Sequence, residues 1–201
     1  MKNENNNPIY SRDVIELVTV AVEYCAFVEQ AREKSRKQFT DVITKILPLL
    51  YIKAAVLPQF ATLQEETWTE DFVTEADYDY VRAGIATVMA EKDDYLDVFV
   101  EDMKYSESPI LATVSENLAD LYQVLKNFAM RYKNETSEED MLEALAEIKE
   151  NFRYEWGQKL VNVLRALHEV RYSEEELDDE DDELEHAQRQ QLMTHNPLLE
   201  K

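Results

Sequence analysis

One row of apolar residues constrains the fold of this 201-residue chain more than any other feature. Between residues 111 and 132, apolar side chains recur at alternating intervals of three and four residues: Leu111, Val114, Leu118, Leu121, Leu125, Phe128 and Tyr132. Because about 3.6 residues make one helical turn, this spacing places all of them on one side of a helix. Such a helix needs a second apolar surface to pack against, so the row predicts a helical bundle.

Turn-forming residues are scarce, which extends the helical prediction to the rest of the chain. The sequence contains two glycines, Gly84 and Gly157, and five prolines. A many-stranded sheet needs frequent turns, and these commonly use glycine or proline. Hydrophobic residues make up 45% of the chain, which is enough to fill a core. We therefore predict an all-α fold, a single-domain bundle of about five to seven helices.

Capping residues indicate where the helices of the first half begin. Ser11 can cap a helix that starts at Arg12 and continues to Gln30. This helix is apolar on most sides, which predicts a central position in the bundle. A second helix is expected from about Ser35 to Leu57, where Pro48 should kink the helix or split it in two. Thr74 is expected to open the third helix.

The second half shows the same signals. Ser108-Pro109 predicts the start of the helix that carries the apolar row, because serine caps a helix and proline suits its first position. The preceding residues 92–107 are interpreted as a loop with a short irregular or helical piece. Thr136 or Ser137 can cap the last helical region. That region is either one long helix or two, with a break near residues 151–157.

Composition changes at both ends of the chain. Residues 1–9 are polar and rich in asparagine, and we expect a disordered N-terminus there. Residues 10–172 carry the helical periodicity and form the bundle domain. Ten acidic residues lie between Ser173 and Glu185. Like charges at that density resist packing, so residues 173–201 are expected to form a mobile acidic tail.

The formal net charge of −22 excludes several classes of partner. Nucleic-acid phosphates and anionic membranes repel a chain this acidic, so neither direct nucleic-acid binding nor membrane binding is expected. The charge either keeps the molecule soluble or attracts a basic protein partner. Cys25 is the single cysteine, so no intrachain disulfide can form. Since no signal peptide or membrane span is evident either, a cytoplasmic location is expected.

A search for catalytic motifs yields no catalytic residues, no cofactor and no metal site. Two distant glycines cannot build a phosphate-binding loop, and no nucleophile elbow is present. The tail sequence Glu183-Leu-Glu-His186 has the spacing of a metal-binding pair, but it lies in a charge run and has no second copy. A Cys25–His168 dyad is conceivable, although a cysteine on an apolar helix face is usually a core residue. Enzymatic activity stays open, and a non-enzymatic role is favoured.

Glu16 and Glu23 form the first candidate site. They are seven residues apart and share one side of an otherwise apolar helix. A buried carboxylate needs a partner, and Arg12, Lys45 or Lys53 could provide one. The pair is therefore either a solvated or ion-paired edge of the helix, or the lining of a groove that binds a small ligand.

The second candidate site lies in the connection between residues 64 and 80. It combines many acidic residues with aromatic ones and contains no lysine or arginine. Aromatic side chains among acids suit docking onto a basic, partly apolar protein. Alternatively, the aromatic rings pack onto the bundle and the acids face water. The residues proposed to bind are Trp68, Asp71, Phe72, Asp77 and Asp79.

Two segments resemble a known family. Residues 14–25, VIELVTVAVEYC, and residues 46–54, ILPLLYIKA, are similar to a small bacterial family of about 200 residues, catalogued as domain of unknown function 5063. The resemblance covers most of the chain apart from the acidic tail. It implies a helical fold and provides no activity, cofactor or catalytic residue.

Three hypotheses for function remain. The first is a non-enzymatic interaction or adaptor protein whose acidic surface docks a basic protein partner. The second is a helical bundle that binds a small ligand, or catalyses weakly, at a groove lined by Glu16 and Glu23. The third is that the tail alone acts, as an electrostatic decoy. Neither the partner nor the oligomeric state can be read from the sequence.

Overall fold

A computed structural model describes residues 7–60, 71–97, 110–134 and 137–173. Helices dominate these residues, which confirms the predicted all-α bundle. The α-helices are α1 (Arg12–Glu29), α2 (Arg36–Val56), α3 (Glu75–Met89), α4 (Val114–Asn134), α5 (Glu138–Asn151) and α6 (Gly157–Tyr172). Two short strands, β1 (Asp94–Leu96) and β2 (Leu111–Thr113), pair antiparallel, with Tyr95 opposite Ala112.

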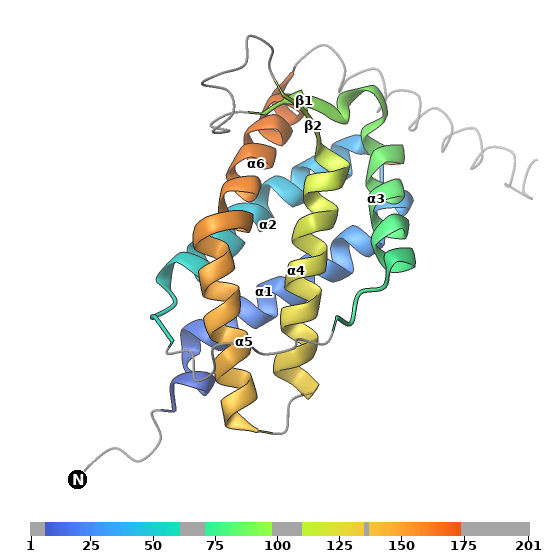
Figure 1. The fold of residues 1–201 in the computed structure, drawn as a ribbon. Coiled ribbons are helices and arrows are strands. Elements are labelled where there is room, and N and C mark those ends of the chain that lie inside the picture. Colours follow the sequence, from blue (N-terminus) through green and yellow to red (C-terminus); the bar gives the residue numbers. More distant parts are fainter. Residues whose placement is uncertain (1–6, 61–70, 98–109, 135–136, 174–201) are drawn as a thin grey trace, which may run out of the picture.

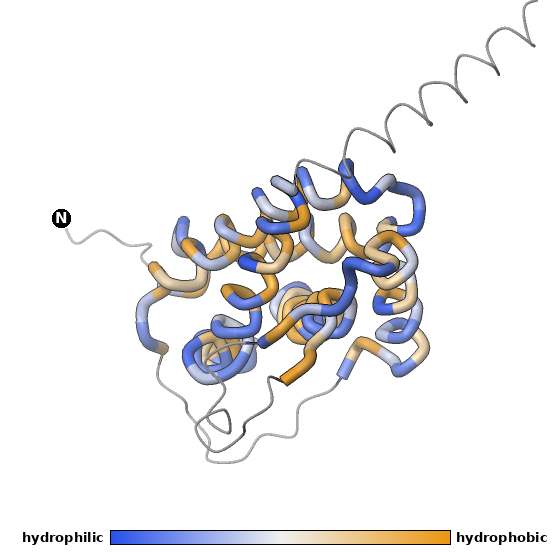
Figure 2. Tube along the Cα trace, turned by 90° about the horizontal axis from the view of Figure 1, so that it is seen from above, coloured by the Kyte–Doolittle hydropathy of each residue, from blue (hydrophilic) through white to orange (hydrophobic). Residues whose placement is uncertain are grey.

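Helix α4 lies at the centre of the bundle, where it contacts α1, α3, α5 and α6. Figure 1 shows it between α3 and α6, with α1 and α2 crossing behind. The apolar row explains this position, because its members from Val114 to Phe128 are buried and Tyr132 packs at the edge of the core. Viewed along α4 in Figure 2, hydrophobic residues gather where the helices face one another.

The predicted beginning of this central helix is wrong. Leu111 belongs to β2 rather than to a helix, and its side chain is 63% exposed. Helix α4 instead begins at Val114, where Thr113 Oγ1 accepts a hydrogen bond from Glu116 N at 3.2 Å. The carboxylate of Asp93 accepts another from Ser115 N at 2.8 Å. These oxygens satisfy amides that a helix leaves free at its start. Residues 108 and 109 lie outside the described ranges.

Helix α1 packs on α2, α3 and α4, as its apolar sequence predicts, but it is not enclosed on all sides. The buried hydroxyl of Tyr24 donates a hydrogen bond to the carbonyl of Leu118 in α4 at 2.7 Å. Ile15 and Val22 point outward and are about half exposed. Helix α2 runs without a break from Arg36 to Val56, so Pro48 does not split it.

The N-terminal segment is better ordered than the sequence suggests. Residues Pro8–Tyr10 form a 3-10 helix, so the expected disorder of residues 1–9 is wrong for Pro8 and Ile9. Ile9 is buried, and its carbonyl accepts a hydrogen bond from the Tyr132 hydroxyl at 2.8 Å. Residues 1–6 lie outside the described ranges, as does nearly all of the acidic tail, residues 174–201.

The last helical region is interrupted where the sequence predicts a break. Ser137 caps α5 by accepting a hydrogen bond from Asp140 N. A π-helical turn, Phe152–Trp156, then joins α5 to α6. At the end of this turn, a Cβ on Gly157 would lie 2.3 Å from the carbonyl oxygen of Phe152, closer than any side chain tolerates. Glycine is therefore required where the turn returns to regular helix. Among the described residues, none of the helices is long and apolar enough to span a membrane.

Candidate functional site

The segment that leads into α3 is fixed by one side chain of α4. The Asn127 side-chain oxygen accepts hydrogen bonds from the backbone amides of Phe72 at 2.9 Å and Val73 at 3.0 Å. Its side-chain nitrogen donates to the carboxylate of Asp71 at 2.9 Å. Backbone amides near the core need such partners, because leaving them without one is costly. Asn127 thus holds Asp71 and Phe72, two of the predicted binding residues, at defined positions.

Asp77, a third predicted binding residue, has a structural role at the start of α3. Thr74 and Asp77 form a capping box, in which each side chain accepts a hydrogen bond from the other residue's backbone amide. The Thr74 hydroxyl also donates to the Asp77 carboxylate at 2.7 Å. These hydrogen bonds from the side chain and backbone of Thr74 lower the pKa of Asp77. Asp77 therefore caps the start of α3, and its carboxylate is less available to a partner.

The outer side of α3 presents the remaining acids to solvent. Glu75 and Asp79 are exposed, and Asp79 forms an ion pair with Arg82 at 3.2 Å, in which both side chains are about half exposed. Such a surface pair holds its partners weakly. The exposed ring of Tyr80 lies beneath the guanidinium of Arg32, which is 4.9 Å from the ring centre. We call Asp71, Phe72, Glu75, Asp79 and Tyr80 the α3 surface.

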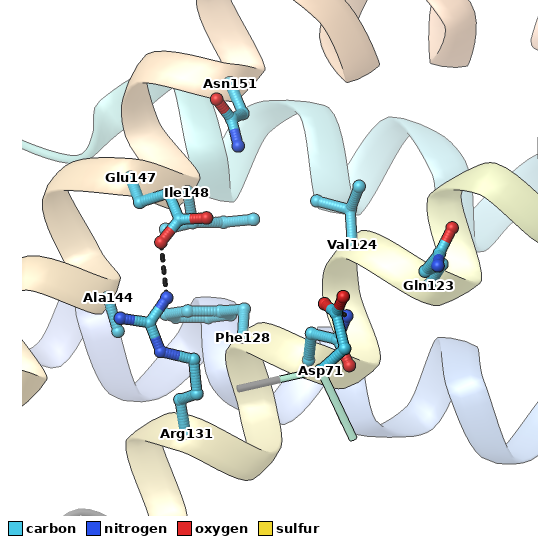
Figure 3. A pocket seen from close by; sticks show the side chains of 10 residues that line it. Asp71, Gln123, Val124, Phe128, Arg131, Ala144, Glu147, Ile148 and Asn151 are labelled. Carbon is cyan, nitrogen blue, oxygen red and sulfur yellow. Dashed lines mark hydrogen bonds and ion pairs between the residues drawn. The ribbon is translucent and has the colours of Figure 1, made fainter. Parts of the chain in front are cut away.

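A cavity of about 180 Å³ opens beside Asp71, between α4 and α5. Figure 3 shows Arg131 reaching from α4 towards Glu147 of α5 on one side of the cavity, with Asp71 on the other. Arg131 is only 8% exposed and forms an ion pair with Glu147. The remaining lining residues supply amides and apolar surface: Gln123, Val124, Asn127, Phe128, Ala144, Ile148 and Asn151.

The charge of the lining and the volume of this cavity limit the kind of group that fits it. Its charged lining is one cation and two carboxylates, Asp71 and Glu147, so it favours a positive group. Its volume is below the ~300 Å³ at which small-molecule sites usually begin. A single long side chain with an apolar stem and a cationic end matches both the size and the charge.

Glu16 and Glu23 lie apart from this region. Lys53 donates to the Glu16 carboxylate at 2.6 Å and Arg12 at 2.7 Å, and these hydrogen bonds lower the pKa of Glu16. Glu23 is exposed. Lys45 binds Asp41 instead, at 2.8 Å. Neither glutamate lines the cavity beside Asp71, the cavity beside Tyr51 and Phe152, or the cavity beside Tyr95 and Asn162.

The remaining sequence hypotheses have these outcomes. Trp68 lies outside the described residues, so the aromatic part of the second site is seen only at Phe72 and beyond. Cys25 is buried, and burial raises the pKa of its thiol to about 12, which is the reverse of an activated nucleophile. His168 is exposed on α6. Within the described residues, no group of histidine, cysteine and acidic side chains is arranged to hold a metal ion.

Sequence reasoning missed two residues that organise the site. Arg131 stands three residues after Phe128, on the buried side of α4, and a charged residue there was a signal that a partner must face it. Asn127 gave no comparable signal, because an asparagine beside an apolar row is usually a solvated residue.

Comparison with known proteins places this architecture in a family. The model of the family described as Domain of unknown function (DUF5063) matches residues 8–173. The crystal structure of protein BF1032 from Bacteroides fragilis is 42% identical in sequence and superposes with a TM-score of 0.72. The match covers 85% of this chain and 99% of that one. No curated protein matches the chain.

Proposed function

Because the chain belongs to the DUF5063 family, whose description states no activity, we propose a function from the geometry of the site: a non-enzymatic interaction protein that docks a basic protein through its α3 surface. The observation that supports this proposal most directly is the recess beside Asp71, lined by Asp71 and Glu147. It provides a place where a lysine or arginine of the partner can insert.

The α3 surface supplies the acidic surround of that recess. Asp71 accepts its hydrogen bond from a neutral amide, so its negative charge is not neutralised by that contact. Glu75 and Asp79 are exposed on the adjoining helix. Exposed carboxylates around an anchoring recess accelerate encounter with a basic partner and select its orientation.

The test is affinity capture with charge-neutral variants. The triple variant Asp71→Asn, Glu75→Gln, Asp79→Asn removes three charges from the α3 surface and leaves the Asp77 cap intact. A matched control, Glu150→Gln, Glu155→Gln, Glu169→Gln, removes the same charge from exposed positions on α5, the π-helical turn and α6. Native lysate of the source organism is passed over each protein, and retained proteins are eluted with increasing salt.

The proposal expects a basic protein that elutes at moderate salt from the wild type and from the control, and is lost from the triple variant. Three exposed charges at ~0.3–0.5 kcal/mol each correspond to a loss of affinity of about five- to thirteenfold at low salt. If the triple variant and the control retain the basic protein equally, net charge alone attracts that protein and the α3 surface is not its docking site. Recovery of no salt-sensitive protein from the wild type would remove the proposal.

The alternative, a small-ligand groove at Glu16 and Glu23, stays a prediction without structural support. The Glu16 carboxylate is ion-paired with Lys53 and Arg12, and Glu23 is exposed and does not line the cavity beside Asp71. No contact seen around either glutamate favours a ligand over an ion-paired helix edge.

A further inference from the structure

Helix α2 carries an apolar stripe on its solvent-facing side. Val42, Leu49 and Val56 stand seven residues apart, with Ile52 between the last two, and their exposed fractions lie between 36% and 53%. Seven residues are close to two helical turns, so the four side chains form one continuous line about 21 Å long. Contiguous exposed apolar surface of this kind in a soluble protein usually marks a contact site. We call these four residues the α2 stripe.

The helix that carries the α2 stripe is basic, although the molecule as a whole is acidic. Residues 36–56 contain four basic residues and one acid, Asp41, in a chain whose net charge is −22. Lys45 is exposed and lies along the stripe, where it pairs with Asp41 at 2.8 Å. Asp41 also accepts a hydrogen bond from Arg171 of α6 at 2.9 Å. One carboxylate therefore faces two cations, which leaves this end of the stripe with an excess of positive charge.

The acidic tail leaves the bundle at that same end. The contact between Arg171 and Asp41 fixes the end of α6 beside the start of the stripe, and the described chain ends two residues later, at Ser173. Residues 174–201 comprise 28 residues, with eleven acidic and two basic side chains. At ~3.3 Å per extended residue, this length exceeds the 21 Å of the stripe several times over. Leu177 and Leu184 repeat the seven-residue interval of the stripe.

We propose that the acidic tail, through residues 174–185, occupies the α2 stripe of its own chain. The two leucines lie against the apolar line, and the acids beside them face Lys45 and Arg171. Charge complementarity and the short distance from Ser173 favour this occupant over a second copy, whose stripe would bring like charges together. The family match ends at residue 173, so residues 174–185 lie outside the part of the chain that the family model matches. It does not depend on the function proposed for the α3 surface.

The test uses paramagnetic relaxation in the full-length protein. Cys25 is buried, so a cysteine introduced by Ala187→Cys is the site that a nitroxide reagent modifies. In the ¹⁵N-labelled protein, the amide signals of α2 from Leu49 to Val56 should lose intensity, and reduction of the nitroxide should restore them. Adding Leu49→Asp or Lys45→Glu should abolish the loss. The control substitution Tyr154→Asp changes an exposed residue on the π-helical turn and should not alter the intensity loss in α2.

Two results would overturn the proposal. The first is the absence of any intensity loss in α2, which would mean that the tail does not visit the stripe. The second is an intensity loss that arises only between molecules. It is detected in a mixture of two samples, one that carries the nitroxide but no ¹⁵N and one that carries ¹⁵N but no nitroxide. That outcome would assign the stripe to a second copy. Unchanged amide spectra outside α2 and the tail confirm that each variant is folded.

Discussion

Asn127 offers the sharpest test of how the candidate site is built. Replacing it with alanine removes the acceptor for the amides of Phe72 and Val73, and the donor to Asp71. An amide that loses its partner costs ~1–3 kcal/mol when buried, and Phe72 remains accessible enough for water to replace part of this. Taking the lower end for each amide, Asn127→Ala should lower the unfolding free energy by about 2 kcal/mol. For a chain of this size the melting temperature should fall by roughly 4–8 °C.

Urea unfolding followed by circular dichroism measures this change, and hydrogen exchange locates it. The amides of Phe72 and Val73 should exchange faster in the variant, while the buried amides of α1 should not. Gln123→Ala is the matched control, because Gln123 lines the same cavity and forms no hydrogen bond to these two amides among the described residues. A loss below about 0.5 kcal/mol for Asn127→Ala would refute the reasoning and show that this side chain does not hold the segment.

Three further predictions concern stability and reactivity. Gly157→Ala forces a methyl group against the Phe152 carbonyl at 2.3 Å, so urea unfolding should show a destabilisation of about 1–3 kcal/mol. The folded-state pKa of Asp77 is lowered by Thr74, so its stabilising contribution is present above the unfolded pKa of about 4 and is lost as pH falls through the folded pKa. Asp77→Asn should therefore flatten the acid side of the curve of unfolding free energy against pH. Cys25 should react slowly with Ellman's reagent at pH 8 and rapidly in denaturant; fast reaction of the native protein would contradict its burial.

The sequence predicted those parts of the fold that depend on local periodicity. The row from Val114 to Tyr132 identified the central helix, because a helix buried on one side repeats its apolar residues every three to four positions. The caps at Thr74 and Ser137 were also predicted, since each side chain acts on an amide only three residues away. Local rules suffice wherever the partners are close in sequence.

The errors arise where distant residues decide the structure. Strands of three residues carry no recognisable pattern, and Leu111 matched the helical row by spacing although it pairs with Leu96 in the sheet. The start of α4 depends on Asp93, more than twenty residues earlier in the chain. Ile15 and Val22 made α1 look central, because an exposed apolar side chain cannot be distinguished from a buried one by its type.

The candidate site was predicted only in part for the same reason. Asp71, Phe72, Asp77 and Asp79 are adjacent in sequence and remain close in the fold, but their roles differ because of contacts that composition does not show. Asp77 is committed to Thr74, whereas Asp71 meets Asn127, 56 residues away. The Arg131–Glu147 pair that completes the recess joins α4 to α5, and its two residues are 16 positions apart in the sequence.

The π-helical turn has a consequence for comparing family members. A π turn holds one residue more than an α turn, so it offsets the angular phase of α6 relative to α5 by about 100°. With this offset, α5 packs against α4 and the N-terminal 3-10 helix, and α6 packs against α2 as well as α4. A relative that lacks one residue between 152 and 156 would need a rotated set of core side chains throughout α6. Single-residue gaps at this point of an alignment therefore mark a change of packing rather than a tolerated loop variation.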